Sequence, residues 1–241
     1  MKISVVVPAF NEERLLPQSL AAISAASSAF AAAGWTTELI VCDNNSPDRT
    51  AEIAAAAGAM VVFEPINQIG RARNAGASRA TGDWLLFVDA DSFPTHELFT
   101  DVASVIASGT CVAGGSTVRV DRTGLAYAAG VGWWNFLSRT FKWAAGSFIF
   151  CEAAVFREIG GFTDRLYAAE EIDLFRRLKR LARRRRRSIV ILHRHPLLTS
   201  ARKAHLYTVR EMLRFWGRTL LSGGRTFRDR EGAFPWYDGR R

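Results

Sequence analysis

The sequence predicts an α/β protein built on a mostly parallel, twisted sheet that is flanked by helices. The chain has 241 residues, of which 49% are hydrophobic and 23% charged, a composition typical of a globular protein with a sizeable core. A continuous β-branched run, Ile3–Val7, is typical of a strand buried on both faces of a parallel sheet. Further short apolar runs alternate with helical segments along the first hundred residues, which favours a parallel sheet with crossover helices.

The first hundred residues justify this prediction element by element. The Ala-rich segment from Glu12 to Ala33 has helical character and stops at Gly34. The loops between elements have two to six residues, which implies right-handed crossovers between neighbouring parallel strands. The predicted strands are Ile3–Val7, Glu38–Cys42, Met60–Phe63 and Trp84–Val88, and the predicted helices are 12–33, Pro47–Ala57 and Gly70–Ala80.

The second half is less regular, but it shows neither an internal repeat nor a Pro/Ser-rich linker. We therefore expect one continuous domain over residues 1–241. An aromatic segment, Leu125–Trp143, is assigned no secondary structure, and its rings fit a core, an acceptor-stacking surface or a membrane-facing surface. The predicted helices are Thr95–Ala107, Ala169–Ala182 and Ala204–Leu221, and the predicted strands are Cys111–Val120, Phe148–Phe150 and Ser188–Leu192.

Composition also excludes several classes of protein. The cysteines Cys42, Cys111 and Cys151 are odd in number and form no CxxC, so a disulfide framework or a cysteine zinc site is not supported and a reducing cytoplasm fits best. The apolar run before Pro8 is too short for a signal peptide. No apolar stretch approaches the roughly 20 residues that span a bilayer. We expect a cytoplasmic protein, either soluble or associated with the inner face of the membrane.

The net charge of +9 is unevenly spread along the chain. Residues 1–100 carry 6 Lys and Arg against 11 Asp and Glu, whereas residues 101–241 carry 26 against 12. Nine of the twelve residues in Arg176–Arg187 are basic, and the run ends in five consecutive arginines, 183–187. This basic C-terminal region indicates an anionic partner such as a membrane surface or an anionic substrate, with nucleic acid as another interpretation. A solvated face without a partner is the alternative.

Carboxylates follow three of the predicted strands. Glu12 and Glu13 come after the first strand, Asp43 after the second, and Asp89 and Asp91 after the fourth. Ligands of such sheets bind in the crevice beyond the carboxyl ends of the strands, so these side chains should meet there. Like charges repel at short range unless a cation or a donor-rich ligand enters. An Asp-x-Asp turn suits a hard cation such as Mg²⁺ or Mn²⁺ and leaves coordination positions for phosphate oxygens.

Two common nucleotide motifs are missing. No Gly-x-Gly-x-x-Gly follows the first strand, and Gly-x-x-x-x-Gly-Lys-Ser/Thr occurs nowhere in the sequence. A dinucleotide-dependent dehydrogenase and a P-loop NTPase therefore both lose support. A sugar-phosphate nucleotidyltransferase would carry a Gly-rich phosphate loop after the first strand, and Pro8–Asn11 is not one.

Six segments together resemble the successive motifs of family 2 glycosyltransferases, which have the GT-A fold. Their order and spacing match over residues 3–91, and the resemblance resumes near residue 160. It implies an inverting transfer of a sugar from a nucleoside diphosphate sugar to an acceptor hydroxyl. Residues 1–100 would then form the nucleotide-sugar and metal half, and residues 101–241 the acceptor half. The segments are Ser4–Glu13, Glu38–Asp48, Gly70–Gly76, Leu86–Asp91, Gly160–Phe162 and Glu170–Leu174.

The resemblance implies roles for individual residues. Glu171, the second residue of an acidic pair at the start of the predicted acceptor-side helix, corresponds to the general base. Asp91 is the principal metal ligand, and His195, expected just past the strand Ser188–Leu192, is the preferred further ligand over His193. We expect a UDP-sugar donor rather than a GDP-sugar. The residues expected to bind the nucleotide-sugar are Pro8, Ala9, Phe10, Glu12, Asp43, Asn44, Arg73, Asp89 and Ala90.

Two departures from the family pattern concern details of the site. The usual Asp-Asp-Gly-Ser reads Asp43–Ser46 with two asparagines, so an amide of Asn44 replaces a carboxylate contact to the base. The usual Glu-Asp pair reads Glu170–Glu171, which lengthens the base by one methylene.

Each site residue also has a structural interpretation. Asp89, Asp91 and Asp43 are common cap residues where a strand leads into a helix, and Arg73 is as well suited to an ion pair. The alternative function is a non-catalytic protein that binds anionic membrane or nucleic acid on a retired nucleotide-binding fold. Such a protein would bind with steep salt dependence and would have no affinity for a sugar nucleotide.

Overall fold

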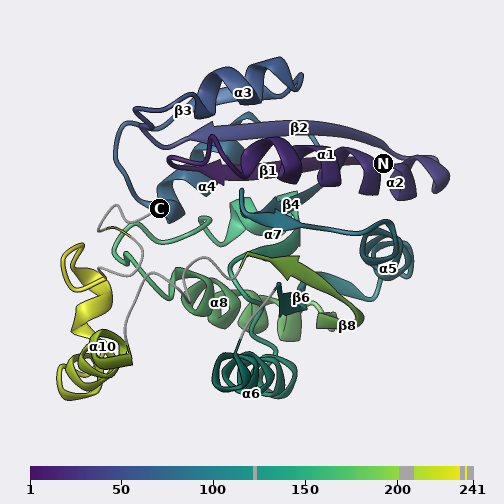
Figure 1. Ribbon diagram of the computed structural model, residues 1–241. Coiled ribbons are helices and arrows are strands. Elements are labelled where there is room, and N and C mark those ends of the chain that lie inside the picture. Colours follow the sequence, from purple (N-terminus) through teal and green to yellow (C-terminus); the bar gives the residue numbers. More distant parts are fainter. Residues whose placement is uncertain (122–123, 201–208, 234–236, 238–241) are drawn as a thin grey trace.

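The computed structural model describes residues 1–121, 124–200, 209–233 and 237. One sheet of eight strands, in the order β3-β2-β1-β4-β7-β6-β8-β5, runs through both halves of the chain (Figure 1). The three pairs among β1 to β4 are parallel, as is the pair of β6 with β8, whereas β7 is antiparallel to both β4 and β6, and β5 is antiparallel to β8. The strands are β1 Lys2–Ala9, β2 Thr36–Asp43, β3 Met60–Phe63, β4 Trp84–Val88, β5 Ser92–Phe93, β6 Cys111–Val120, β7 Phe148–Glu152 and β8 Ser188–Thr199.

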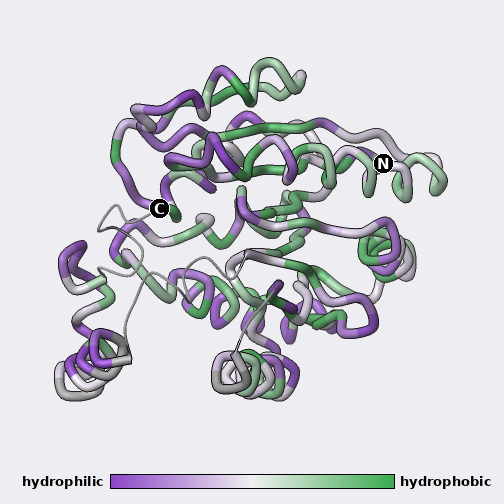
Figure 2. Tube along the Cα trace, in the orientation of Figure 1, coloured by the Kyte–Doolittle hydropathy of each residue, from purple (hydrophilic) through white to green (hydrophobic). Residues whose placement is uncertain are grey.

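Helices cover both faces of the sheet, as the hydrophobic runs predict. Val5 and Val7 of β1 pack with α1, α2 and α5 on one face, while Val6 packs with α4, α7 and α8 on the other. Figure 2 shows the resulting concentration of hydrophobic residues along the central strands. The helices are α1 Leu16–Ala26, α2 Ser28–Ala32, α3 Thr50–Ala56, α4 Ile69–Arg79, α5 His96–Ala107, α6 Leu125–Phe141, α7 Ala153–Glu158, α8 Glu170–Arg184, α10 Val209–Leu221 and the 3₁₀ helix η1 Arg225–Arg228.

Strand order places the carboxyl ends of β1, β2 and β4 at one edge of the sheet. β1 pairs in parallel with β2 on one side and with β4 on the other, so Ala9 and Asp43 lie side by side while the end of β4 lies across β1. The connection from β1 leads to β2 on one side of β1, and the later connection from β3 to β4 leads to the other side. This is the position at which open α/β sheets form their binding crevice.

Several predicted boundaries are wrong. The helix predicted over 12–33 is two helices, because residues 12–15 form a turn and the chain breaks at Ser27, whose hydroxyl bonds back to the Ile23 carbonyl. The strand predicted over Ser188–Leu192 continues to Thr199, since its second half pairs with β6 beyond a bulge and with β5. The aromatic segment forms α6. The start of the predicted helix at Ala204 lies outside the described residues.

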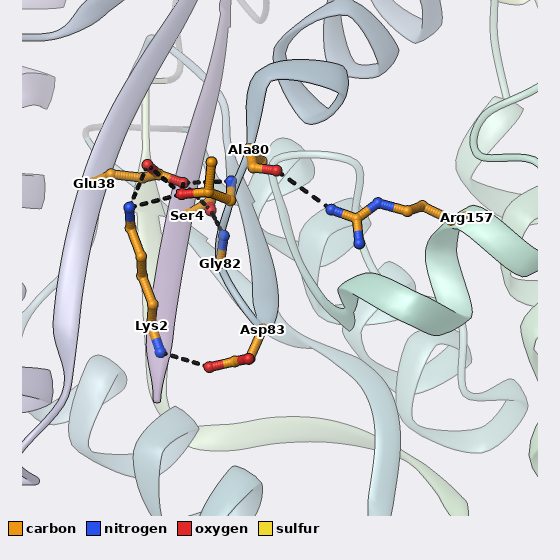
Figure 3. Close-up of polar contacts among 8 residues, drawn as sticks. Lys2, Ser4, Glu38, Ala80, Gly82, Asp83 and Arg157 are labelled. Carbon is orange, nitrogen blue, oxygen red and sulfur yellow. Dashed lines mark hydrogen bonds and ion pairs between the residues drawn. The ribbon is translucent and has the colours of Figure 1, made fainter.

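The amino-terminal edge of the sheet is closed by a polar cluster, opposite to the crevice (Figure 3). The Ser4 hydroxyl is buried, donates to Glu38 Oε1 at 2.5 Å and accepts from the Gly82 N–H at 2.8 Å. The Lys2 ammonium lies 2.7 Å from Glu38 Oε2. Burial alone would raise the pKa of Glu38, but its bonds to Lys2, Ser4 and Thr81 lower it to about 2. This cluster fixes the register of β1, β2 and β4 far from the crevice.

None of the helices in the described part of the chain is both long and apolar enough to cross a membrane. The cysteines at 42, 111 and 151 are buried and free.

Candidate active site

The crevice at the carboxyl ends of β1, β2 and β4 holds a cavity of about 70 Å³. It brings together eight of the residues that the sequence predicts for the donor and metal site. It also contains Tyr237, from the C-terminal segment, which the sequence prediction missed. The lining residues are Pro8, Ala9, Phe10, Glu12, Asn44, Asn67, Ile69, Ala72, Asp89, Ala90, Asp91 and Tyr237.

Asn44 joins the loops around the crevice. Its amide Nδ2 donates to the carbonyls of Glu64 at 3.0 Å and Ile66 at 2.7 Å, and its Oδ1 accepts from the Gln68 N–H at 2.9 Å. Both amide protons are therefore used within the protein, so the predicted amide contact to a nucleobase has no free donor. Asp43 is buried and accepts from the Ser46 N–H at 3.2 Å, which closes the turn after β2.

Arg73, from α4, lies at the centre of the site and is fully buried. Its Nη2 donates to Asp89 Oδ1 at 2.9 Å and to the Gly146 carbonyl at 2.8 Å, and its Nη1 donates to Glu170 Oε1 at 2.6 Å. Although burial disfavours the charge, the carboxylates of Asp89, Glu170 and Glu171 hold the pKa of Arg73 above its usual value. Both ends of the guanidinium join the end of β4 to the start of α8, and the predicted contact of Arg73 with the donor's ribose or phosphates stays a prediction.

The acidic pair begins α8 directly after Ala169, which adopts a left-handed backbone with φ of 61°. Glu170 is buried against Arg73, whereas Glu171 is partly buried and close to the same charges. Burial and the neighbouring Glu170 carboxylate raise the pKa of Glu171 to about 8, and Arg73 lowers it only in part. A carboxyl that titrates near neutral pH is suited to general acid–base chemistry, whereas the ion-paired Glu170 is suited to positioning.

Asp89 and Asp91, the carboxylates that the sequence predicts for the metal site, both line the cavity. The backbone N–H of Asp89 donates to the Ser147 carbonyl at 3.1 Å, and the carbonyl of Asp91 accepts from the Ser200 N–H at 3.0 Å. Carboxylate oxygens of this kind are the ligands that Mg²⁺ and Mn²⁺ prefer, so the two residues fit a divalent cation. Among the described residues, no group of three His, Cys, Asp or Glu gathers around a single point. Further ligands would have to come from substrate oxygens, water or residues outside the described ranges.

His195 does not lie where we predicted it. It sits within β8 rather than just past it, because that strand continues to Thr199. Its ring Nδ1 lies 3.0 Å from Asp101 Oδ2 on α5, and the part of β8 that reaches Asp91 is Thr199 and the following Ser200. Metal binding by His195 therefore stays a prediction that no contact with Asp91 supports.

The sequence analysis missed the place of Tyr237 in the cavity and the ion pairs of two arginines in the basic run. The Tyr237 hydroxyl accepts from the Ile69 N–H at 3.1 Å, and its ring meets Tyr167 edge-on at 5.4 Å. Burial chiefly raises its pKa. In the run 183–187, Arg185 pairs with Glu158 and Arg187 with Glu152. Part of the run is thus structural.

Comparison with known proteins agrees with this geometry. The family model "Glycosyl transferase family 2" matches residues 4–159. An uncharacterized glycosyltransferase of Mycobacterium tuberculosis is 44% identical over 89 residues, which are 37% of this chain and 36% of that relative. S. aureus TarS 1–349 in complex with UDP has a TM-score of 0.63 at 19% identity, over 83% of this chain and 61% of that chain.

A second solved structure binds a different donor. The mannosyltransferase PcManGT from Pyrobaculum calidifontis, in complex with GDP-Man and Mn²⁺, has a TM-score of 0.63 at 19% identity, over 81% of this chain and 56% of that chain. At such identities the likeness shows the shared mixed α/β fold of GT-A type. The family match covers well over half of the sequence, and with the crevice, its carboxylates and the strand order it leads to one conclusion: the chain belongs to glycosyl transferase family 2.

Proposed function

We propose that this protein is an inverting, metal-dependent glycosyltransferase that moves a sugar from a nucleoside diphosphate sugar to an acceptor hydroxyl. One observation carries the proposal. The buried Arg73 links Asp89, in the cavity at the ends of the strands, to the acidic pair at the start of α8. Asp89, which we expect beside the donor, and the start of the helix that carries the proposed general base are thereby held in one unit, which supports a direct displacement.

In the proposed reaction Glu171 accepts the proton of the acceptor hydroxyl. The acceptor oxygen then bonds to C1 of the sugar as the bond from C1 to the diphosphate oxygen breaks and its electron pair leaves with the diphosphate. A divalent cation held by Asp91 and Asp89 would neutralise the charge on the departing diphosphate. Arg73 keeps Asp89 and Glu170 oriented while the reaction proceeds.

We propose a uridine nucleotide as the donor's carrier rather than guanosine. The structural neighbours include one with UDP and one with GDP-Man. A pyrimidine is the smaller base, and the cavity of about 70 Å³ is narrow beside the roughly 300–1,000 Å³ typical of ligand pockets. Tyr237 would have to move for either donor to enter. The acceptor is proposed to be anionic or lipid-linked and to be met at the inner face of the membrane, because the positive charge is concentrated in the second half of the chain.

Hydrolysis of UDP-sugars and GDP-sugars with Mg²⁺ or Mn²⁺ tests the proposal, because slow donor hydrolysis reveals the donor without the acceptor. We expect metal-dependent release of UDP by the wild type and its loss in Asp91→Asn. The matched control is Asp164→Asn, an exposed carboxylate outside the cavity, which should hydrolyse as the wild type does. Glu171→Gln should bind the donor but fail to transfer its sugar. Steeply salt-dependent binding to vesicles or nucleic acid, without affinity for any sugar nucleotide, would favour the non-catalytic alternative instead.

A further inference from the structure

Helix α6 presents aromatic side chains to solvent although it is anchored to the core. On its inner side, the Asn135 amide bonds to the backbone of Val118 on β6. Its Oδ1 accepts from the Val118 N–H at 3.0 Å, and its Nδ2 donates to the Val118 carbonyl at 2.8 Å. On its outer side, Trp133 and Phe136 are 62% and 58% exposed, and Phe141 is 49% exposed. The helix is therefore held firmly by one face while the other keeps three large rings in water.

The exposed rings occur in stacked pairs rather than singly. Trp133 and Phe136 stack on each other with centroids 5.6 Å apart, and Phe141 stacks on Trp143 at 5.0 Å. Contiguous apolar patches on soluble proteins mark contact with a partner or a membrane. Trp and Phe on one face of a helix are typical of segments that insert into the headgroup region of a bilayer.

Cations surround the rings. A pocket of about 430 Å³ beside Phe136 is lined by Arg139, Lys142 and His193. Lys179 of α8 lies over the Trp143 ring at 5.2 Å and donates to the Phe141 carbonyl, so α8 meets the end of α6. The basic side chains of α8 therefore continue the surface that α6 begins.

The basic side chains on α8 and next to it fall into two groups. Arg177 and Arg185 pair with Asp173 and Glu158. In contrast, no carboxylate among the described residues lies within ion-pair distance of Lys142, Lys179 or Arg183. The cations beside the aromatic rings thus have no acidic partner among the described residues, and Lys142 and Arg183 are exposed and available to an anionic one.

We propose that this face docks on a bilayer that contains anionic lipids. The docking surface consists of Trp133, Phe136 and Phe141 of α6 with Lys142, Lys179 and Arg183 beside them. A second copy of the chain fits less well, because pairing two such surfaces brings like charges together. Single-stranded nucleic acid also fits less well, since the two outer rings already cover each other's faces.

Docking in this way would bring the active site to the membrane. The chain leads into α6 from Asp121, whose N–H donates to the Thr199 carbonyl at 3.4 Å, and the next residue after Thr199, Ser200, donates to the Asp91 carbonyl at 3.0 Å. Helix α6 lies at the lower side of the molecule in Figure 1, and its C-terminal end meets α8 through Lys179. A lipid-borne acceptor would reach the crevice from the surface on which the enzyme rests. The docking itself does not rest on the proposed function.

Vesicle sedimentation without any donor tests the proposal. The full chain is mixed with phosphatidylcholine vesicles that contain no anionic lipid or about 30% phosphatidylglycerol, at low and at high salt. We expect binding to the anionic vesicles and its weakening by salt. The double variant Trp133→Ser/Phe136→Ser should bind these vesicles at least about tenfold more weakly than the wild type. Phe63→Ser is the matched control, because Phe63 is 61% exposed on β3, at the opposite side of the molecule.

A second pair of variants tests the charges. Lys142→Glu/Arg183→Glu should lose binding to anionic vesicles, whereas Arg49→Glu/Arg79→Glu, with the same change in charge in the acidic half, should retain most of it. All variants change exposed side chains, so melting temperatures should match the wild type. Undiminished vesicle binding by Trp133→Ser/Phe136→Ser would overturn the proposal, as would a dimer that this variant abolishes or RNA binding that exceeds vesicle binding. Asp91→Asn should bind vesicles normally, which separates this test from that of catalysis.

Discussion

Replacing Arg73 by methionine removes the charge that holds the two sides of the active site together but keeps most of the side chain's volume. Asp89 and Glu170 would then lose a guanidinium that lies 2.9 and 2.6 Å from their oxygens, and Glu170 is only 5% exposed. Removing one partner of a buried ion pair costs about 3–5 kcal/mol, because an uncompensated charge is left behind. For a chain of this size each kcal/mol lowers the melting temperature by roughly 2–4 °C, so we expect a loss of about 6–20 °C.

Urea unfolding followed by circular dichroism measures this cost. The matched control is Arg71→Met, two residues earlier on the same helix, whose exposed pair with Asp164 at 3.4 Å should contribute at most about 1 kcal/mol. Adding Glu170→Gln to Arg73→Met should recover part of the loss, since a neutral amide needs no counter-charge. If Arg73→Met unfolds within about 1 kcal/mol of Arg71→Met, the buried network does not hold the site together.

The other predictions concern three separate sites. In a pH profile of kcat/KM, transfer should fall below pH about 8, because the protonated Glu171 carboxyl cannot accept a proton; a rate that is independent of pH from about 6 to 9 would contradict this assignment. Tyr237→Ala should bind UDP more tightly in calorimetry, since the ring no longer has to leave the cavity, and weaker binding would mean that the ring contacts the donor instead. The free energy of unfolding of the wild type should fall as pH drops from about 4.5 towards 2, because a pKa lowered in the folded state stabilises the protein only while Glu38 is ionised; Glu38→Gln should lose this dependence, and an unchanged acid slope would refute it.

The regular half of the fold could be predicted because burial on both faces leaves a clear pattern. The predicted strand Trp84–Val88 agrees with β4 to the residue, and Cys111–Val120 agrees with β6. Helix α6 could not be recognised, because Gly130 and Gly132 weaken the helical pattern and aromatic residues occupy both of its faces. The end of β8 could not be predicted either, because it is set by pairing with β5 and β6, which lie far away in the sequence.

The site could be predicted as a set of residues but not as a set of roles. Pro8, Asp89 and Asp91 line one cavity, as their positions after buried strands indicate. The role of Arg73 depends on Glu170, which lies 97 residues away in sequence, so its burial was not visible in a local motif. Asn44 likewise binds loops that come together only in the folded chain.

The central claim is that Asp91 holds a metal that binds the donor's diphosphate. Isothermal titration calorimetry with UDP tests it most directly, in the presence of Mn²⁺ and after addition of a chelator. We predict that the wild type binds UDP only with the metal and that Asp91→Ala abolishes the metal-dependent part of the affinity. An affinity for UDP that neither the chelator nor Asp91→Ala changes would contradict the account.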